Sequence, residues 1–196
     1  AAIPTEDRKD HADHGDHDDH HDHAAHGDEE HEHHHEVDPH LWLDASCVKR
    51  LAQAVRAEVL KTNVGSDAAA FDAFTSKVDA IDAKYRQTLA SAKTRAVVVA
   101  HDAWGRLADR YSITTIAIGG LNAGEPTPRA VEAAAGAATS HGVLAVAIEP
   151  QVSARVARRI ASGSGLRIVT LDPLGSGDWF EMMERNLRAL AESLGV

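Results

Sequence analysis

The sequence of 196 residues contains a single cysteine, Cys47, and aromatic residues make up only 4% of it. One thiol excludes an internal disulfide bond and any metal site built from several cysteines. No apolar run approaches the roughly 18 residues that suggest a membrane-spanning helix. Basic residues are nowhere interleaved with aromatic ones, so nucleic acid is not an expected partner.

Sequence signatures of export are also missing. The start, AAIPTEDRKD, has neither the basic region nor the apolar region of a secretory signal peptide. We therefore expect the chain to be either cytosolic or already processed.

Histidine and acidic residues are instead concentrated at the amino-terminal end. Residues 1–36 hold 11 of the 14 histidines and 13 acidic residues, against two basic ones. We expect this segment to be disordered, because almost nothing apolar offsets the entropy lost on ordering. Imidazole and carboxylate are ligands of borderline divalent metals, zinc above all. The segment predicts metal collection with modest affinity per ion; an expression tag or a solvated acidic arm is the alternative interpretation.

The remainder of the chain has a different composition. Residues 37–196 carry 17 acidic and 18 basic residues, so the formal charge of −10 belongs to the amino-terminal segment. We predict two parts: the histidine-rich segment at 1–36 and an α/β metal-binding lobe at 37–196.

Two helices are expected at the start of the second part, at 44–62 and 67–91. Asp44 is suited to be the N-cap of the first. Each helix carries apolar residues at spacings of three and four, which place them on one face. These residues are Val48, Leu51, Val55 and Val59 in the first helix, and Phe71, Phe74, Val78, Ile81, Tyr85 and Leu89 in the second.

From residue 95 onward, apolar runs alternate with helical patterns. Continuous apolar runs are typical of buried parallel strands, and they occupy 95–100, 113–118, 143–148 and 166–171. The helices between and after them are expected at 103–111, from Thr127–Pro128, from a Ser153 N-cap, and from Asp178 with Glu181 three residues later. The order predicts an α/β fold, with a four-stranded parallel sheet, flanking helices and the long helix at 67–91 ahead of it.

Three polar residues follow strands of this predicted sheet. His101 follows the first strand, Glu149 the third and Asp172 the fourth, and Pro173 stiffens the turn after Asp172. Any one of them alone is better explained as a helix-capping or loop-bracing group than as a metal ligand. Ligands bind beyond the carboxyl ends of parallel strands, however, and three such residues on one edge favour a metal site.

Two further histidines lie in the second part of the chain. His40 stands in VDPHLWLD, where the histidine-rich run ends. Trp42 and Leu43 are expected to anchor this segment, so His40 is interpreted as a held ligand and not merely the last member of the run. His141 ends a helix and is expected to complement its dipole, so it is left out of the site.

Four strings carry a resemblance to a known family. They are DPHLWLD (38–44), HDAWGRLADRY (101–111), IEPQ (148–151) and TLDPLG (170–175). In this order they resemble the zinc-binding solute receptors of bacterial metal-uptake ABC transporters. The acidic, histidine-rich segment ahead of DPH is also similar to that of zinc-type members.

The resemblance implies two α/β lobes joined by a long rigid helix, here 67–91, with metal held in the cleft. By position, His40, His101 and Asp172 match three of the family's metal ligands. Glu149 matches an acid near the site, which we expect to orient a ligand histidine. Manganese-type members tend to carry glutamate in place of His101, so His101 argues for zinc.

The resemblance further implies an amino-terminal lobe that supplies one more histidine and that this sequence lacks. The expected function is high-affinity zinc binding in the periplasm, or at the cell surface, and delivery to an ABC permease. A zinc buffer or metallochaperone acting through residues 1–36 stays open as the alternative. No enzyme is expected: an open zinc position with Glu149 as base would suit a metallohydrolase, but no HExxH or Gly-x-Ser-x-Gly motif accompanies it.

Overall fold

The computed structural model describes residues 38–62, 67–121 and 124–196, so the expectations for residues 1–36 lie outside it. The predicted α/β fold is confirmed, and none of the helices in the described ranges is long and apolar enough to cross a membrane. In chain order the elements are η1 (Leu41–Leu43), α1 (Ala45–Val59), α2 (Ala68–Leu89), β1 (Ala96–Val99), α3 (Gly105–Tyr111), β2 (Thr114–Ala117), α4 (Pro128–Ser140), β3 (Ala145–Ile148), α5 (Arg155–Ser164), β4 (Arg167–Thr170) and α6 (Trp179–Leu194).

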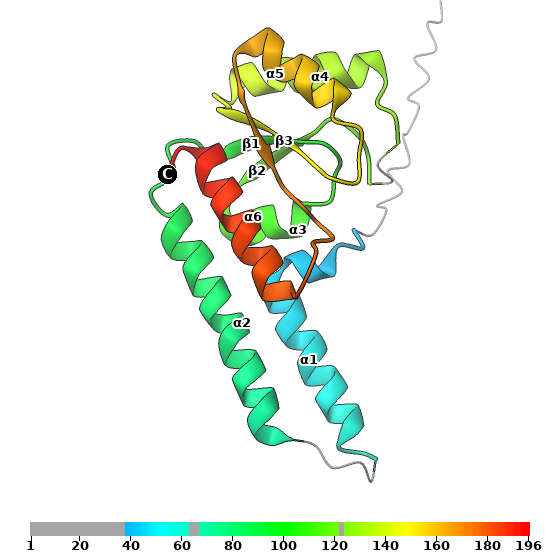
Figure 1. The fold of residues 1–196 in the computed structure, drawn as a ribbon, viewed down its shortest axis with the longest axis vertical. Coiled ribbons are helices and arrows are strands. Elements are labelled where there is room, and N and C mark those ends of the chain that lie inside the picture. Colours follow the sequence, from blue (N-terminus) through cyan, green and yellow to red (C-terminus); the bar gives the residue numbers. More distant parts are fainter. Residues whose placement is uncertain (1–37, 63–66, 122–123) are drawn as a thin grey trace, which may run out of the picture. The chain divides into compact units, whose positions relative to one another are not determined.

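The four strands form one parallel sheet in the order β2-β1-β3-β4 (Figure 1). Each strand lies within the apolar run that predicted it. All four residues of β1 are buried, as expected of a strand covered on both faces. Because successive side chains of a strand point to opposite faces, Val97 and Val99 join one core cluster while Val98 joins the other.

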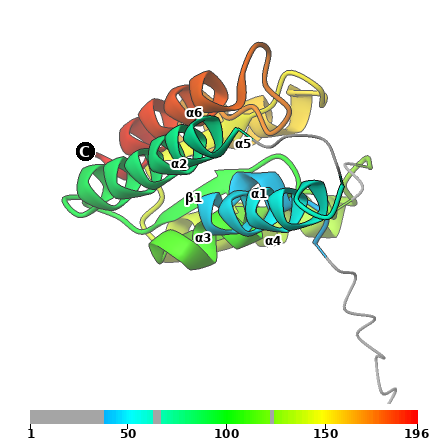
Figure 2. The same cartoon turned by 90° about the horizontal axis from the view of Figure 1, so that it is seen from below.

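Helices cover both faces of the sheet. On one face, α4 and α5 pack through Ala134, Ala138 and Ile160. On the other, α3, α6 and part of α2 form the larger cluster (Figures 1 and 2). In that cluster α2 lies beside α6, and the Tyr85 hydroxyl donates a 2.7 Å hydrogen bond to the Met183 carbonyl.

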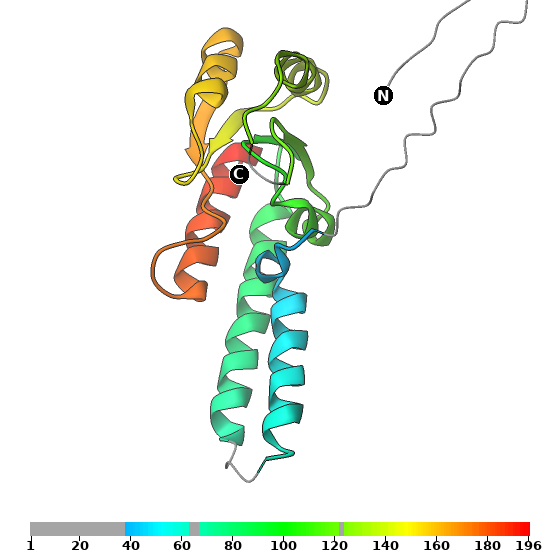
Figure 3. The ribbon, with the colours of Figure 1, turned by 90° about the vertical axis from the view of Figure 1, so that its right-hand side faces the viewer.

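Helices α1 and α2 form a hairpin that extends beyond the sheet and its helices (Figure 3). The predicted face of α2 is buried at Ile81 and Tyr85. The predicted face of α1 is not: Leu51 and Val55 are 63% and 55% exposed. The described residues therefore account for the apolar face of one helix and leave most of the other uncovered.

Helix caps largely follow the sequence. The side chains of Asp44, Thr127 and Asp178 accept hydrogen bonds from the first turns of α1, α4 and α6, as predicted. The prediction that Ser153 caps α5 is wrong, because Ala154 occupies that position and no side chain caps the helix. The Ser153 hydroxyl accepts only a long, 3.5 Å hydrogen bond from the backbone nitrogen of Arg155.

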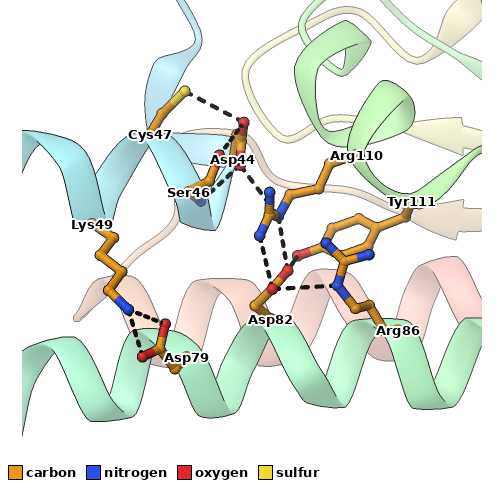
Figure 4. A network of polar contacts seen from close by, with 9 residues as sticks. All are labelled: Asp44, Ser46, Cys47, Lys49, Asp79, Asp82, Arg86, Arg110 and Tyr111. Atoms are coloured by element: carbon orange, nitrogen blue, oxygen red, sulfur yellow. Dashed lines mark hydrogen bonds and ion pairs between the residues drawn. The ribbon is translucent and has the colours of Figure 1, made fainter.

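A polar network joins the base of the hairpin to α3 (Figure 4). Arg110 donates to both carboxylate oxygens of Asp82 at 2.7 and 2.8 Å and lies 3.4 Å from Asp44. The Tyr111 hydroxyl also donates to Asp82. Since Asp44 is the N-cap of α1, this network fixes the chain just after η1 and His40.

Candidate metal site

The site lies at the edge of the sheet where the parallel strands end. His101 follows β1, Glu149 follows β3 and Asp172 follows β4. His40 reaches the same region from another element, as the residue that precedes η1. The imidazole rings of His40 and His101 have centroids 5.5 Å apart, and both residues are more than nine-tenths buried. The structure thus brings together two predicted ligands that are 61 residues apart in the sequence.

His101 contacts a buried carboxylate. Its Nδ1 atom lies 2.6 Å from Oε2 of Glu149, which is 3% exposed. The indole N–H of Trp104 donates to the other carboxylate oxygen at 3.2 Å. Burial raises the pKa of Glu149, and contacts with His101 and Trp104 only partly offset this. Glu149 lies where its expected role of orienting a histidine requires, and that role stays a prediction.

His40 has a carboxylate partner as well. Its Nδ1 atom lies 2.8 Å from Oδ1 of Asp38, and the same oxygen accepts the His40 backbone N–H at 2.9 Å. A carboxylate oxygen that accepts from Nδ1 of a neutral imidazole leaves Nε2 with its lone pair, so this contact suits the tautomer that binds metal through Nε2. A histidine paired with a carboxylate in this way can present Nε2 to a metal. His101 has its carboxylate beside the same ring atom, although Nδ1 of His101 and Oε2 of Glu149 form no hydrogen bond of ordinary geometry. Asp38 belongs to the DPH string, but the sequence alone indicated no role for it.

Asp172 is held by donors at its own loop. Its Oδ1 atom accepts from the Gln151 side chain at 2.6 Å and from the backbone of Gly175 and Leu174 at 2.9 and 3.2 Å. Burial on its own raises the pKa of Asp172, but these hydrogen bonds and nearby Arg185 outweigh it and leave the pKa lowered. Asp172 is therefore a stable anion, as a metal-ligating carboxylate must be.

The side chain of Asn186 in α6 fixes the backbone of Asp172. The Asn186 carbonyl oxygen accepts the Asp172 N–H at 2.9 Å, and its amide donates to the Asp172 carbonyl at 2.8 Å. Asn186 is 1% exposed, so this two-point contact is buried. A polar residue within the apolar pattern of the last helix was the only sequence signal for it.

The three predicted ligands do not yet form one site. Within the described ranges, no group of three or more His, Cys, Asp or Glu side chains is placed to hold a metal ion. His40 and His101 meet, whereas Asp172 faces Gln151 and its own loop. His141 is the C-cap of α4 and precedes β3, which puts it at the opposite edge of the sheet. The three-ligand site of His40, His101 and Asp172 stays a prediction, of which the histidine pair is the assembled part.

Known proteins resemble this chain in sequence and in fold. The chain is 28% identical over 178 residues to the zinc-binding lipoprotein AdcA of Streptococcus pneumoniae, covering 84% of this chain and 35% of AdcA. It is 28% identical over 176 residues to the high-affinity zinc uptake system protein ZnuA of Bacillus subtilis, covering 83% of this chain and 55% of that protein. A crystal structure of ZnuA superimposes with a TM-score of 0.70 at 26% identity, covering 80% of this chain and 60% of that one.

The chain thus spans between about a third and just over half of the curated relatives it matches. The match to the family itself is more extensive. The family profile described as "ZnuA: Zinc-uptake complex component A periplasmic" matches residues 2–193. The chain therefore belongs to the ZnuA family of periplasmic zinc-uptake components, the zinc-binding solute receptors of ABC transporters.

Proposed function

We propose that this chain is the metal-holding half of a periplasmic or cell-surface zinc receptor, which captures zinc and delivers it to an ABC permease. The observation that carries the proposal is the buried pair of His40 and His101. Zinc is the cargo in this function and not a cofactor, and capture requires no turnover.

The donor set suits zinc. Two imidazole nitrogens and one carboxylate oxygen, with a fourth ligand, match the tetrahedral preference of this ion. His40 and His101 each have a carboxylate close to Nδ1, a position from which it would favour the tautomer that binds metal through Nε2. Asp172 completes the set of three if its loop moves toward the histidines when the ion arrives. The relatives named above, a zinc-binding lipoprotein and a zinc uptake protein, support the same cargo.

The rest of the receptor is proposed to be an amino-terminal lobe. The curated relatives are longer than this chain, which leaves room for such a lobe. The exposed apolar residues of α1, including Leu51 and Val55, offer a surface for it. The same lobe would supply the remaining zinc ligand, so the histidine pair would close onto the ion from one side of a cleft.

The histidine-rich segment at 1–36 is proposed to collect zinc for this site. Its net charge of −11 attracts cations, and its 11 histidines supply many imidazole ligands that can each hold an ion with modest affinity. The tight site is held by the fold instead.

Replacing a paired histidine tests the proposal. His101→Gln keeps an amide that faces Glu149 but removes the imidazole. We expect the tightest zinc to be bound more weakly by over about 100-fold, more than the loss of an outer partner usually costs. Competition with a chromophoric chelator measures this affinity in the full chain and in a chain lacking residues 1–36.

His141→Gln is the matched control, because it makes the same change at an exposed histidine on the opposite edge. It should leave the tightest site unchanged. Deleting residues 1–36 should lower the number of ions bound and keep the tight one. If that deletion abolishes tight binding, or if His101→Gln has no effect, zinc is held mainly by the segment and the buffer function replaces the receptor.

A further inference from the structure

All three tryptophans of the chain donate their indole N–H to groups around the histidine pair. Trp104 donates to the carboxylate of Glu149 at 3.2 Å. Trp42 donates to the carbonyl of Pro173 at 2.7 Å, and Trp179 donates to the carbonyl of Trp42 at 2.7 Å. The last two bonds join the segment of His40 to the loop that begins at Asp172, across more than 130 residues of sequence.

Trp42 is held from both ends of that loop. Pro173, which accepts from the Trp42 ring, is the residue after Asp172. Trp179, which donates to the Trp42 backbone, is the first residue of α6, where the loop ends. The Trp42 ring also meets the His40 ring edge to face, with centroids 5.4 Å apart and an angle of 64° between the rings. A single side chain therefore touches one predicted ligand and the residue adjoining another.

Neither ligand segment is rigid by its own secondary structure. Residues 41–43 form one short 3-10 turn, with no side chain capping it at His40. Such a turn has poorer hydrogen-bond geometry than an α-helix, and this one is joined to α1 through Asp44. The loop from 172 to 178 contains no helix or strand. Tertiary contacts must therefore set their positions. Asn186 holds the Asp172 backbone and Arg110 lies beside Asp44, so each segment is tied to the fold. The two tryptophan hydrogen bonds link the segments directly to each other.

We propose that Trp42 is a positioning residue of the zinc site, which keeps His40 and the Asp172 loop in register so that both can reach one ion. This inference rests on the proposed function. Trp42 acts through its hydrogen bond to Pro173 and its contact with the His40 ring. Trp179 supports it by fixing the Trp42 backbone.

The test compares two variants that each lose one hydrogen bond from an aromatic side chain to a backbone carbonyl. Trp42→Phe keeps an aromatic ring beside His40 and loses the bond to Pro173. Tyr85→Phe loses the equally short bond to Met183, which joins α2 to α6 within the core. Both variants are titrated with zinc against a chelator as the full chain, and both are melted without metal.

We expect both variants to melt at a lower temperature than the parent, and only Trp42→Phe to bind the tightest zinc more weakly, by about tenfold. Zinc should also perturb tryptophan fluorescence in the parent and change it less in Trp42→Phe. Equal affinities for the two variants, with tight binding by the parent intact, would overturn the inference and leave the proposed function standing. A parent chain without a tight site overturns both.

A second pair of variants separates positioning from general loosening. If Trp42 acts by placing the Asp172 loop, Trp42→Phe should cost little further affinity in a chain that already carries Asp172→Ala, because contacting residues are not additive. A full additional loss in that chain contradicts the inference. If Trp42→Phe fails to fold, Trp179→Phe replaces it, because it removes the hydrogen bond to the Trp42 carbonyl. It should also weaken zinc binding, and an unchanged zinc affinity would contradict the inference.

Discussion

His40 and His101 meet ring to ring, yet the two halves of this pair are supported differently. His101 faces Glu149, a residue from another strand that is 3% exposed and raised in pKa by burial. His40 faces Asp38, two residues earlier in the chain, whose side chain is 21% exposed. His101, which we call the inner histidine, depends on the folded sheet to bring Glu149 to it. His40, the outer histidine, has its partner Asp38 two residues away in the sequence.

The two carboxylates therefore act on their histidines under different conditions. Glu149 is buried away from solvent: Trp104 donates to its Oε1, and its Oε2 lies 2.6 Å from Nδ1 of His101. Asp38 also contacts the exposed side, where Arg106 lies 3.8 Å from its second oxygen. Replacing Glu149 should therefore change zinc affinity strongly, whereas solvent should reduce the effect of replacing Asp38.

The largest effect is expected for Glu149→Gln. The new amide can still accept from Trp104, but it then presents N–H to Nδ1 of His101. That arrangement makes Nδ1 the acceptor and moves the imidazole proton to Nε2, where zinc should bind. We expect zinc affinity to fall by about 10- to 100-fold, measured by chelator competition.

Glu184→Gln is the matched control, because it makes the same substitution at a surface carboxylate that pairs with Lys84. It should leave the zinc affinity unchanged. If Glu149→Gln binds zinc as tightly as the parent, the buried carboxylate does not set the tautomer of His101, and the inner histidine is no more constrained than the outer.

The fold could be predicted closely because its signals are local. The four apolar runs mark the strands, and Asp44, Thr127 and Asp178 mark three helix starts. Ser153 misled because a capping residue is recognised by type, while the helix begins where the chain leaves its turn. The open face of α1 could not be foreseen, since spacing identifies an apolar face but not what covers it.

The site was predictable only in part. His101 and Glu149 follow strands, and the edge of a parallel sheet collects such residues. The contact of Gln151 with Asp172 depends on β3 and β4 being neighbours, and the order β2-β1-β3-β4 is not written in the pattern of runs. The partnership of Asp38 with His40 depends on the local turn of the chain.

The segment of His40 also depends on the polar network of Arg110, Asp82 and Asp44 that fixes the start of α1. Burial on its own raises the pKa of Asp82, but hydrogen bonds from Arg110 and Tyr111 outweigh it and lower the pKa. An acid with a lowered pKa stabilises the fold above its unfolded value, and this contribution is lost as the pH falls through the folded value. Arg110→Gln should therefore cost about 1.5–3 kcal/mol at pH 7, measured by urea unfolding.

The difference between Arg110→Gln and the parent should shrink once the pH falls below about 3.8, the ordinary pKa of the carboxyl. Arg188→Gln, at an exposed residue of α6, is the control and should change stability by less than about 0.5 kcal/mol. A loss of stability in Arg110→Gln that stays constant down to pH 3 would show that Asp82 does not carry it.

The smallest effect is expected for Asp38→Asn. The asparagine carbonyl can accept both hydrogen bonds that Asp38 accepts from His40, so the tautomer with a free Nε2 survives. Only the charge of Asp38 is lost, and the solvent that reaches this partly exposed side chain already screens that charge. We expect zinc affinity to fall by less than about tenfold, below the loss for Glu149→Gln. Equal losses for the two variants would contradict the proposed difference between Glu149 and Asp38. They would show that each carboxylate contributes its charge and not the direction of its hydrogen bond.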